Sequence, residues 1–389
     1  MTLALPRRTL LLGLGAAGLA SRAIAQTDRF VVPPLAPLRM EMGRITKVTV
    51  CLRPFRAAGP RLDVEKVGSK RVVHNYGHGG SGWSLSWGSA QIATAKALEG
   101  GTKRVAVIGC GAIGLTTALT LLRAGAKVTI YAADRTPYTR SVRATGTWSP
   151  DSRIADHDRI DAGFPALWDS MARSSYATWQ TLLGRPGDPV AWSDRYGLAD
   201  PIIETPPIAF PDRPVNAPEI RFFEQRLPGL APRGHDLQPG QHPFPVSRAR
   251  LSTSMQFNVA ELAHLLTTDF LLEGGRIETR TFNTPADLQR LRQPVIVNCT
   301  GYGARALWKD ESVVPVRGQI NWLAPQPEVH YGLYYRDVNV LPRPDGIVVQ
   351  YSGTSDMWGY GCEDETPDMA EAEAAIRTIA PLFEAPKAL

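Results

Sequence analysis

The sequence predicts an α/β fold with a Rossmann-like domain and a second domain. Residues 104–124 have the pattern of a buried strand, a glycine-rich turn and a helix, which is how a Rossmann-like unit begins. At 389 residues the chain is long enough for more than one domain of about 150 residues. Hydrophobic residues make up 43% and charged residues 21%, so the chain can bury a full core and is neither disordered nor fibrous. After residue 25 no apolar run approaches the ~20 residues of a membrane span.

The N-terminus has the features of an export signal. Arg7 and Arg8 precede an apolar stretch over residues 10–20, and residues 23–25 (AIA) form a small-residue cleavage site. This arrangement predicts a twin-arginine signal peptide over residues 1–25 and a periplasmic location. The alternative is a buried N-terminal helix with two incidental arginines. Removing the segment lowers the formal charge from +6 to +3, because it carries three arginines and no acid. So mild a charge does not imply a nucleic-acid partner.

The four cysteines form no C-x-x-C pair. They are Cys51, Cys110, Cys299 and Cys362. A periplasmic location permits a disulfide, and Cys51–Cys362 is the only pair outside a cofactor-like motif. The sequence does not decide between this disulfide and free thiols, and free thiols are the default expectation.

A phosphate-binding turn lies in the middle of the chain. Residues 104–108 (RVAVI) form a short apolar run typical of a parallel strand covered on both faces. The turn 109–114 (GCGAIG) follows, then a predicted helix over residues 115–124 and a second strand over residues 127–131. Asp134 comes 25 residues after the first glycine of the turn. The G-x-G-x-x-G motif therefore stands in its required strand–turn–helix context.

Each residue of this motif has a physical role in binding a dinucleotide. Gly109 permits the turn, Gly111 lets the backbone approach a pyrophosphate, and Gly114 lets the helix pack closely against the strand. Free N–H groups at the helix start bind phosphate, and Asp134 accepts hydrogen bonds from ribose hydroxyls. The motif does not distinguish FAD from NAD. Arg135, beside the acid, leaves a cofactor with a 2′-phosphate open.

Three further segments favour a flat ligand. Residues 145–148 (TGTW) follow the acid, and residues 295–301 (VIVNCTG) form a buried strand that ends in Thr-Gly. Residues 72–88 (VVHNYGHGGSGWSLSWG) place many glycines beside aromatic side chains. Glycine is needed where a Cβ would clash with a ligand lying directly on the backbone.

On these residues the sequence resembles the D-amino-acid oxidase family, which includes D-aspartate oxidase. The matching motifs are VIGCGAIGLTTAL, YAADRTP with ATGTW, VIVNCTG, PVRGQI, LRPFR and VVHNYGHGGSGWSLSWG. The resemblance implies FAD as the cofactor. It also implies a Rossmann-like FAD-binding domain and a substrate domain with a large mixed β-sheet.

The order of the motifs implies a circular permutation of the family fold. In the family, LRPxR and HNYGHGG lie near the C-terminus, whereas here they precede the Rossmann strand. A helix-like stretch over residues 89–98 is joined to that strand by residues 99–103, which span at most about 17 Å. The new C-terminus, residues 370–389, would then be an interior helix of the family. Such rearrangement is tolerated because domain termini often lie close together.

The resemblance also implies domain boundaries and site residues. The FAD-binding domain is expected over residues 70–150 and 250–312, and the substrate domain over residues 40–69, 151–249 and 313–389. Arg53 is implied as the carboxylate-binding arginine, and the Gly80 carbonyl as the acceptor for the substrate amine. The residues expected to bind FAD are Gly79, Gly80, Ser81, Gly82, Trp83, Ser84, Gly109, Gly111, Ala112, Ile113, Gly114, Asp134, Arg135, Ser141, Gly146 and Thr147.

The implied reaction is oxidative deamination of a D-amino acid. A carboxylate-bearing amine transfers a hydride from Cα to flavin N5 and gives an imino acid, which hydrolyses to a keto acid and ammonia. The electrons pass to O2, giving H2O2, or to an unknown carrier. Two alternatives stay open: a flavin dehydrogenase that acts on another amine or hydroxy acid and feeds a respiratory carrier, and a flavin-binding protein without turnover. The sequence gives neither the oligomeric state nor the substrate.

Two departures from the family pattern concern the substrate pocket. The family has tyrosines before a T-S-L-like strand, and the matching stretch here, residues 244–254, has none. Arg248 and Arg250 either face the pocket and favour an acidic substrate, or lie in solvent, which is the expected case. His74 and His78 do not predict a metal site, since glycines between and after them disfavour the helix that such spacing requires. The segment 351–360 is expected to pack as strand and turn, with a position over the pocket as the alternative.

Overall fold

The computed structural model describes residues 34–201, 208–210, 217, 218, 220, 223 and 226–384. The predicted signal peptide, residues 1–25, lies outside the described residues. In the described ranges, no helix combines the length and the apolar character that crossing a membrane requires. The strands and helices, in chain order, are β1 (Ile45–Arg56), β2 (Val64–Val67), β3 (Lys70–His74), α1 (Gly82–Leu98), β4 (Arg104–Ile108), α2 (Ala112–Arg123), β5 (Lys127–Ala132), α3 (Phe164–Gln180), β6 (Val190–Pro201), β7 (His235–Leu237), β8 (Val246–Phe257), α4 (Val259–Leu272), β9 (Arg276–Thr279), β10 (Val295–Asn298), α5 (Ala304–Leu307), β11 (Val313–Leu323), β12 (Tyr331–Tyr335), β13 (Val338–Arg343), β14 (Gly346–Tyr351) and α6 (Met369–Ile379).

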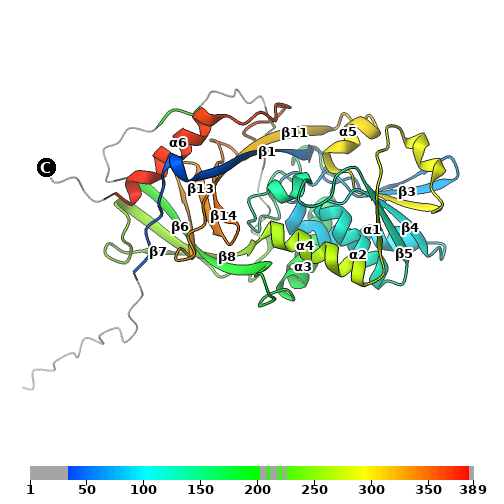
Figure 1. Ribbon diagram of the computed structural model, residues 1–389, viewed down its shortest axis with the longest axis horizontal. Helices are drawn as coiled ribbons and strands as arrows, with labels where there is room; N and C mark the ends of the chain where they lie inside the picture. The colour runs from blue at the N-terminus through cyan, green and yellow to red at the C-terminus, as the bar shows by residue number, and fades with distance from the viewer. Residues whose placement is uncertain are drawn as a thin grey trace, which may run out of the picture. The chain divides into compact units, whose positions relative to one another are not determined.

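A six-stranded sheet forms the Rossmann-like part of the molecule. Its strand order is β2-β3-β10-β4-β5-β9, and all neighbours pair in parallel except β2 with β3. Helices α1, α2 and α4 lie beside this sheet (Figure 1). The apolar run of β4 is buried because alternate residues face opposite sides: Val107 contacts the helices, and Ile108 belongs to a cluster on the other face.

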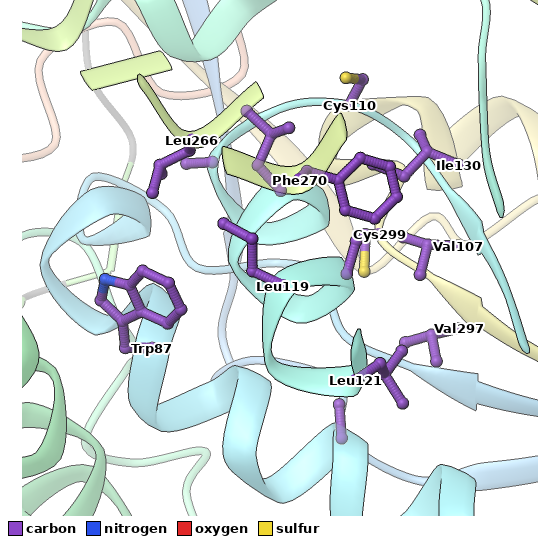
Figure 2. Packing of buried hydrophobic residues seen from close by; sticks show 14 of the residues in the cluster. Trp87, Val107, Cys110, Leu119, Leu121, Ile130, Leu266, Phe270, Val297 and Cys299 are labelled. Atoms are coloured by element: carbon purple, nitrogen blue, oxygen red, sulfur yellow. The ribbon is translucent and has the colours of Figure 1, made fainter. Parts of the chain in front are cut away.

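The helices contribute large side chains to the core on their side of the sheet. Leu119 of α2, Leu266 and Phe270 of α4, and Val107 and Val297 of the strands lie in one cluster, shown in Figure 2. These side chains are almost fully buried. This packing fixes the N-terminus of α2, and therefore the glycine-rich turn, at the carboxyl end of β4.

An eight-stranded sheet forms the second part. Its order is β1-β11-β14-β13-β12-β6-β8-β7, and it is mixed because β12 pairs in parallel with β6 while the other pairs are antiparallel. The predicted α/β class, with a Rossmann-like domain and a large mixed sheet, is confirmed. Helix α6 is held to β11 by a buried ion pair, Arg317 to Glu371 at 3.3 Å.

Three segments lie in a different part of the molecule from the domain that the sequence predicted for them. Strand β2 pairs in the six-stranded sheet, so this part begins near residue 64 rather than 70. Strand β8 belongs to the eight-stranded sheet throughout, so the second FAD-domain segment begins after Phe257 rather than at residue 250. Helix α3, expected in the substrate domain, packs on α1, where the Trp179 indole donates to the Trp83 carbonyl at 3.0 Å.

The two described ends of the chain contact the same region of the eight-stranded sheet. The Tyr331 hydroxyl donates to the Ala36 carbonyl at 2.8 Å. The Tyr331 ring also lies 6.2 Å from the ring of Phe244, which in turn lies 6.0 Å from the ring of Phe383.

Candidate active site

A cavity of about 580 Å³ extends from the six-stranded sheet to the eight-stranded sheet. Its walls come from the β4–α2 turn, the loop between β3 and α1, the segment that follows β5, and strands β1, β6, β12, β13 and β14. Gly80 and Gly111, 31 residues apart in the sequence, line this one cavity.

The three glycine positions of the β4–α2 turn have no room for side chains. Gly109 has φ +108°, and a Cβ there would lie 2.5 Å from the Cys299 carbonyl oxygen. A Cβ on Gly111 would lie 2.6 Å from the Ser141 hydroxyl, and one on Gly114 would lie 2.0 Å from the Gly109 oxygen. Gly109 and Gly111 line the cavity, whereas Gly114 lies outside its lining and lets α2 pack against the turn. The turn therefore presents bare backbone at the N-terminus of α2, as a pyrophosphate requires.

Asp134 and Arg135, which follow β5, lie in different environments. Asp134 lines the cavity, where its carboxylate can accept hydrogen bonds from a ribose. Arg135 is exposed, donates to the Ile277 carbonyl at 3.2 Å and does not line the cavity. The structure therefore gives no support to a 2′-phosphate held by Arg135.

The loop between β3 and α1 forms a second glycine-built wall. Gly79 has φ +53°, and a Cβ there would lie 1.7 Å from the Arg153 carbonyl oxygen. A Cβ on Gly80 would lie 2.6 Å from the Ser152 hydroxyl. Ser81 is buried behind the cavity wall, where its hydroxyl donates to the Ser152 carbonyl at 2.9 Å. The close packing on residues 152 and 153 explains why glycine is needed at both positions.

Ser141 joins the two glycine-built walls. Its hydroxyl accepts a hydrogen bond from the Ala112 N–H at 2.9 Å, and its carbonyl accepts one from the Trp83 indole at 2.8 Å. The predicted FAD-contact residues that line the cavity are Gly79, Gly80, Gly82, Trp83, Ser84, Gly109, Gly111, Ala112, Ile113, Asp134, Ser141, Gly146 and Thr147. Ser81, Gly114 and Arg135 do not line it.

Arg53 lies at the other end of the cavity, on β1. Its guanidinium covers Gly318, where a Cβ would lie 2.1 Å from both Nη1 and Nη2. Among the described residues, its guanidinium donates one long hydrogen bond, from Nη1 to the Val316 carbonyl at 3.5 Å. Burial lowers the pKa of Arg53. Guanidinium groups keep their charge in proteins. Arg53 thus offers the cavity a charged group that can bind a carboxylate through two parallel bonds.

A second arginine at this end is already paired. The Arg153 Nη1 lies 2.9 Å from an Asp356 oxygen, and the Asp356 carboxylate also accepts from the Arg153 N–H at 3.1 Å and the Ser152 hydroxyl at 3.2 Å. Burial lowers the pKa of Arg153 to about 10. Asp356 lies in the segment 351–360, and Ser352 and Asp356 line the cavity, so this segment does contribute to its wall.

Strand β6 contributes an arginine to the cavity that sequence reasoning missed. Arg195 of β6 lines the cavity together with Tyr334, Asn339 and Gln350 of the neighbouring strands. Arg248 and Arg250, the residues considered from the sequence, do not line it: both are exposed, and Arg250 pairs with Asp236 at 2.9 Å. Tyr334 of β12 supplies a tyrosine to the cavity, although the stretch 244–254 has none.

His78 is a buried residue of the cavity wall. It is 2% exposed, and neither ring nitrogen has a hydrogen-bond partner among the residues that the structure describes. Burial lowers the pKa of His78 to about 3, so the ring is neutral at ordinary pH. All four cysteines are free thiols, and three of them, Cys51, Cys110 and Cys299, line the cavity.

The fold and the cavity define a dinucleotide-binding protein whose cavity also extends to Arg53 of β1. Residues 104–388 match the family model described as FAD dependent oxidoreductase. The chain is 30% identical over 286 residues to a D-amino-acid oxidase of Streptomyces coelicolor, covering 72% of this chain and 77% of that protein. It is 28% identical over 289 residues to a D-amino-acid oxidase of Rubrobacter xylanophilus, with the same coverage.

A solved structure shows the same fold. Glycine oxidase from Bacillus cereus ATCC 14579 has a TM-score of 0.50 and 15% identity, covering 72% of this chain and 79% of that one. The chain belongs to the family of FAD-dependent oxidoreductases that contains the D-amino-acid oxidases. Its cofactor is FAD, and the two glycine-built walls fit a flat dinucleotide, because Gly109, Gly111, Gly79 and Gly80 line the cavity with backbone alone.

Proposed function

We propose that this enzyme oxidises D-amino acids to imino acids, which hydrolyse to keto acids and ammonia, and that O2 accepts the electrons to give H2O2. The observation that carries the proposal is that Arg53 lines the same cavity as both glycine-built walls. A charged guanidinium without a carboxylate partner among the described residues is suited to the one group that all amino acids share.

The chain's residues act mainly by positioning the substrate. Arg53 binds the α-carboxylate through two parallel bonds, and the Gly80 carbonyl accepts a hydrogen bond from the α-amine, so Cα is fixed between them. FAD, when bound, supplies the two-electron acceptor for the hydride that leaves Cα. His78, neutral and buried, adds no charge beside the amine. The amine enters neutral, and no side chain is required as a base.

We further propose that the chain is a circular permutation of the family fold. The family model begins its match at residue 104, and the two motifs that the family carries near its C-terminus lie before that point. Strand β3, which precedes β4 in the chain, is separated from it in the sheet by β10. The join runs through Gly100 and Gly101, which have φ of +83° and +77°.

Restoring the family order tests this proposal. The rearranged chain would start at Gly101 and end at Gly100, with its present C-terminus joined to residue 36 by a short flexible linker. It should bind FAD, because Tyr331 and Phe244 connect the two ends in the present fold. A rearranged chain that cannot fold would count against the permutation. Export of the protein to the periplasm through residues 1–25 is a separate proposal, supported by the paired arginines.

The experiment for the main proposal is anaerobic flavin reduction. Purified holoenzyme is mixed with a panel of D- and L-amino acids without oxygen, and air is then admitted. We expect D-amino acids to bleach the flavin absorbance near 450 nm and air to restore it. Bleaching without recovery in air would instead indicate a dehydrogenase with another electron acceptor. Absence of bleaching by every amino and hydroxy acid would indicate a flavin-binding protein without turnover.

A further inference from the structure

Arg195 is a charged residue of the cavity wall, and its hydrogen-bond partners among the described residues are neutral. Its Nη1 donates to the Thr147 hydroxyl at 3.3 Å, and its Nη2 donates to the Asn339 side-chain oxygen. Among the residues that the structure describes, no carboxylate lies within ion-pair distance of Arg195. A guanidinium has five N–H donors, so these two bonds orient the group and leave donors for a ligand.

Arg195 is held in place by several strands rather than lying loose at the surface. Its strand β6 pairs with β8 on one side and with β12 on the other, where Arg195 lies opposite Gly332. Asn339 is 7% exposed, and Thr147 is the residue after Gly146, a predicted FAD contact. The guanidinium therefore lies beside the segment expected to approach the flavin.

The charges at this end of the cavity do not balance. Six arginines line the cavity: Arg53, Arg140, Arg143, Arg153, Arg195 and Arg280. Arg140 and Arg143 pair with Glu365, and Arg280 follows β9 of the six-stranded sheet. Asp356 pairs with Arg153. The α-carboxylate of a substrate would pair with Arg53. Burial lowers the pKa of Arg195, because its charged form is less stable away from water. One cation is therefore left without a counter-charge when an ordinary amino acid binds.

We infer that Arg195 binds a second carboxylate, carried by the side chain of the substrate, so the preferred substrates are dicarboxylic D-amino acids such as D-aspartate or D-glutamate. The inference rests on the proposed function. The FAD pyrophosphate is not the missing anion, because the turn that binds it, Gly109 to Gly114, lies on the six-stranded sheet and Arg195 lies on the eight-stranded one. A neutral substrate is disfavoured as well, since it would leave Arg195 desolvated and unpaired.

The test compares pairs of substrates of equal size. D-Aspartate and D-asparagine differ by one charge, as do D-glutamate and D-glutamine. The holoenzyme is expected to favour at least one acid over its amide by about 100-fold in kcat/KM, the effect of one buried charge-assisted contact. Arg195→Met should reduce this ratio to near one, and an unchanged ratio would overturn the inference. Arg250→Met, an exposed arginine on the neighbouring strand, is the matched control and should keep the wild-type ratio.

A binding measurement supplies an independent readout. Malonate, with two carboxylates, should perturb the flavin spectrum of the wild type at much lower concentration than acetate, and Arg195→Met should remove most of this difference. Wild-type enzyme that oxidises neutral D-amino acids but does not prefer the acids would overturn the role of Arg195 and leave the proposed function standing. If no amino acid reduces the flavin, the proposed function fails. Malonate binding no tighter than acetate would then overturn the anion site as well.

Discussion

Gly318 offers a way to displace Arg53 without touching the substrate or the cofactor. The residue lies on β11 opposite Cys51, outside the cavity lining, with the Arg53 guanidinium directly over it. A Cβ at this position would lie 2.1 Å from both terminal nitrogens of Arg53. Since carbon contacts settle near 3.5 Å, the guanidinium must withdraw by more than about 1 Å in Gly318→Ala. The backbone of Gly318 is an ordinary strand, so alanine itself causes no strain.

The size of the effect follows from the hydrogen bonds that the displacement breaks. Losing one of two charge-assisted bonds to the α-carboxylate costs about 1.5–3 kcal/mol, so kcat/KM should fall by roughly 10- to 150-fold. The loss should fall mainly on KM, because the carboxylate is bound before and during the reaction alike. The FAD content should not change.

Steady-state oxidation of a D-amino acid, with FAD content measured on the same preparation, is the assay. Gly197→Ala is the matched control. Gly197 lies in a strand of the same sheet, and a Cβ there would come no closer than 3.9 Å to the nearest atom, the Arg250 carbonyl oxygen. The control should behave as wild type. A Gly318→Ala enzyme with unchanged KM would show that Arg53 does not bind the carboxylate.

Three further predictions concern residues that hold the site. Ser141→Ala leaves the first N–H of α2 without its partner and should weaken FAD binding by about 5- to 10-fold, measured by flavin fluorescence; unchanged affinity would remove Ser141 from the site. Asp356→Asn should destabilise the protein by about 3–5 kcal/mol in urea unfolding, because Arg153 is left buried and unpaired, whereas Asp236→Asn, in an exposed pair, should cost about 1 kcal/mol or less. His78 has a native pKa of about 3, below its unfolded value, so the unfolded chain binds the extra proton and stability falls as pH drops below about 6.5. At pH 5 the loss should be about 2 kcal/mol smaller in His78→Asn, and equal losses in both proteins would refute this.

The strand and the glycine-rich turn could be located from the sequence because the information there is local. The β4–α2 turn needs glycines at fixed positions within one strand–turn–helix unit, and β4 has the predicted bounds. Helix α1 begins at Gly82 rather than near residue 89. The prediction missed its first turns because they contain glycines, which have a low helix propensity. One of them, Gly88, is needed for packing, since a Cβ there would lie 2.3 Å from the Met171 carbonyl oxygen of α3.

The substrate end was harder to predict because it depends on strand pairing across the whole sheet. Alternation indicates that Arg248 and Arg250 share one face of a strand but not which face, and a shift of one residue reverses the choice. The cavity takes its arginine from β6, the antiparallel partner of that strand, in Arg195. Likewise, nothing in the sequence connects Arg153 with Asp356, about 200 residues apart, until the fold places them in contact.

The central claim is that two glycine-built walls, one before the Rossmann strand and one after it, hold a single FAD. The most direct measurement is the dissociation constant of FAD from Gly80→Val, with Gly43→Val, where a Cβ meets nothing within 4 Å, as control. We predict that the wild type and Gly43→Val bind one FAD per chain with the same affinity, and that Gly80→Val binds it far more weakly although its G-x-G-x-x-G turn is intact. An unchanged dissociation constant in a folded Gly80→Val protein would contradict the account.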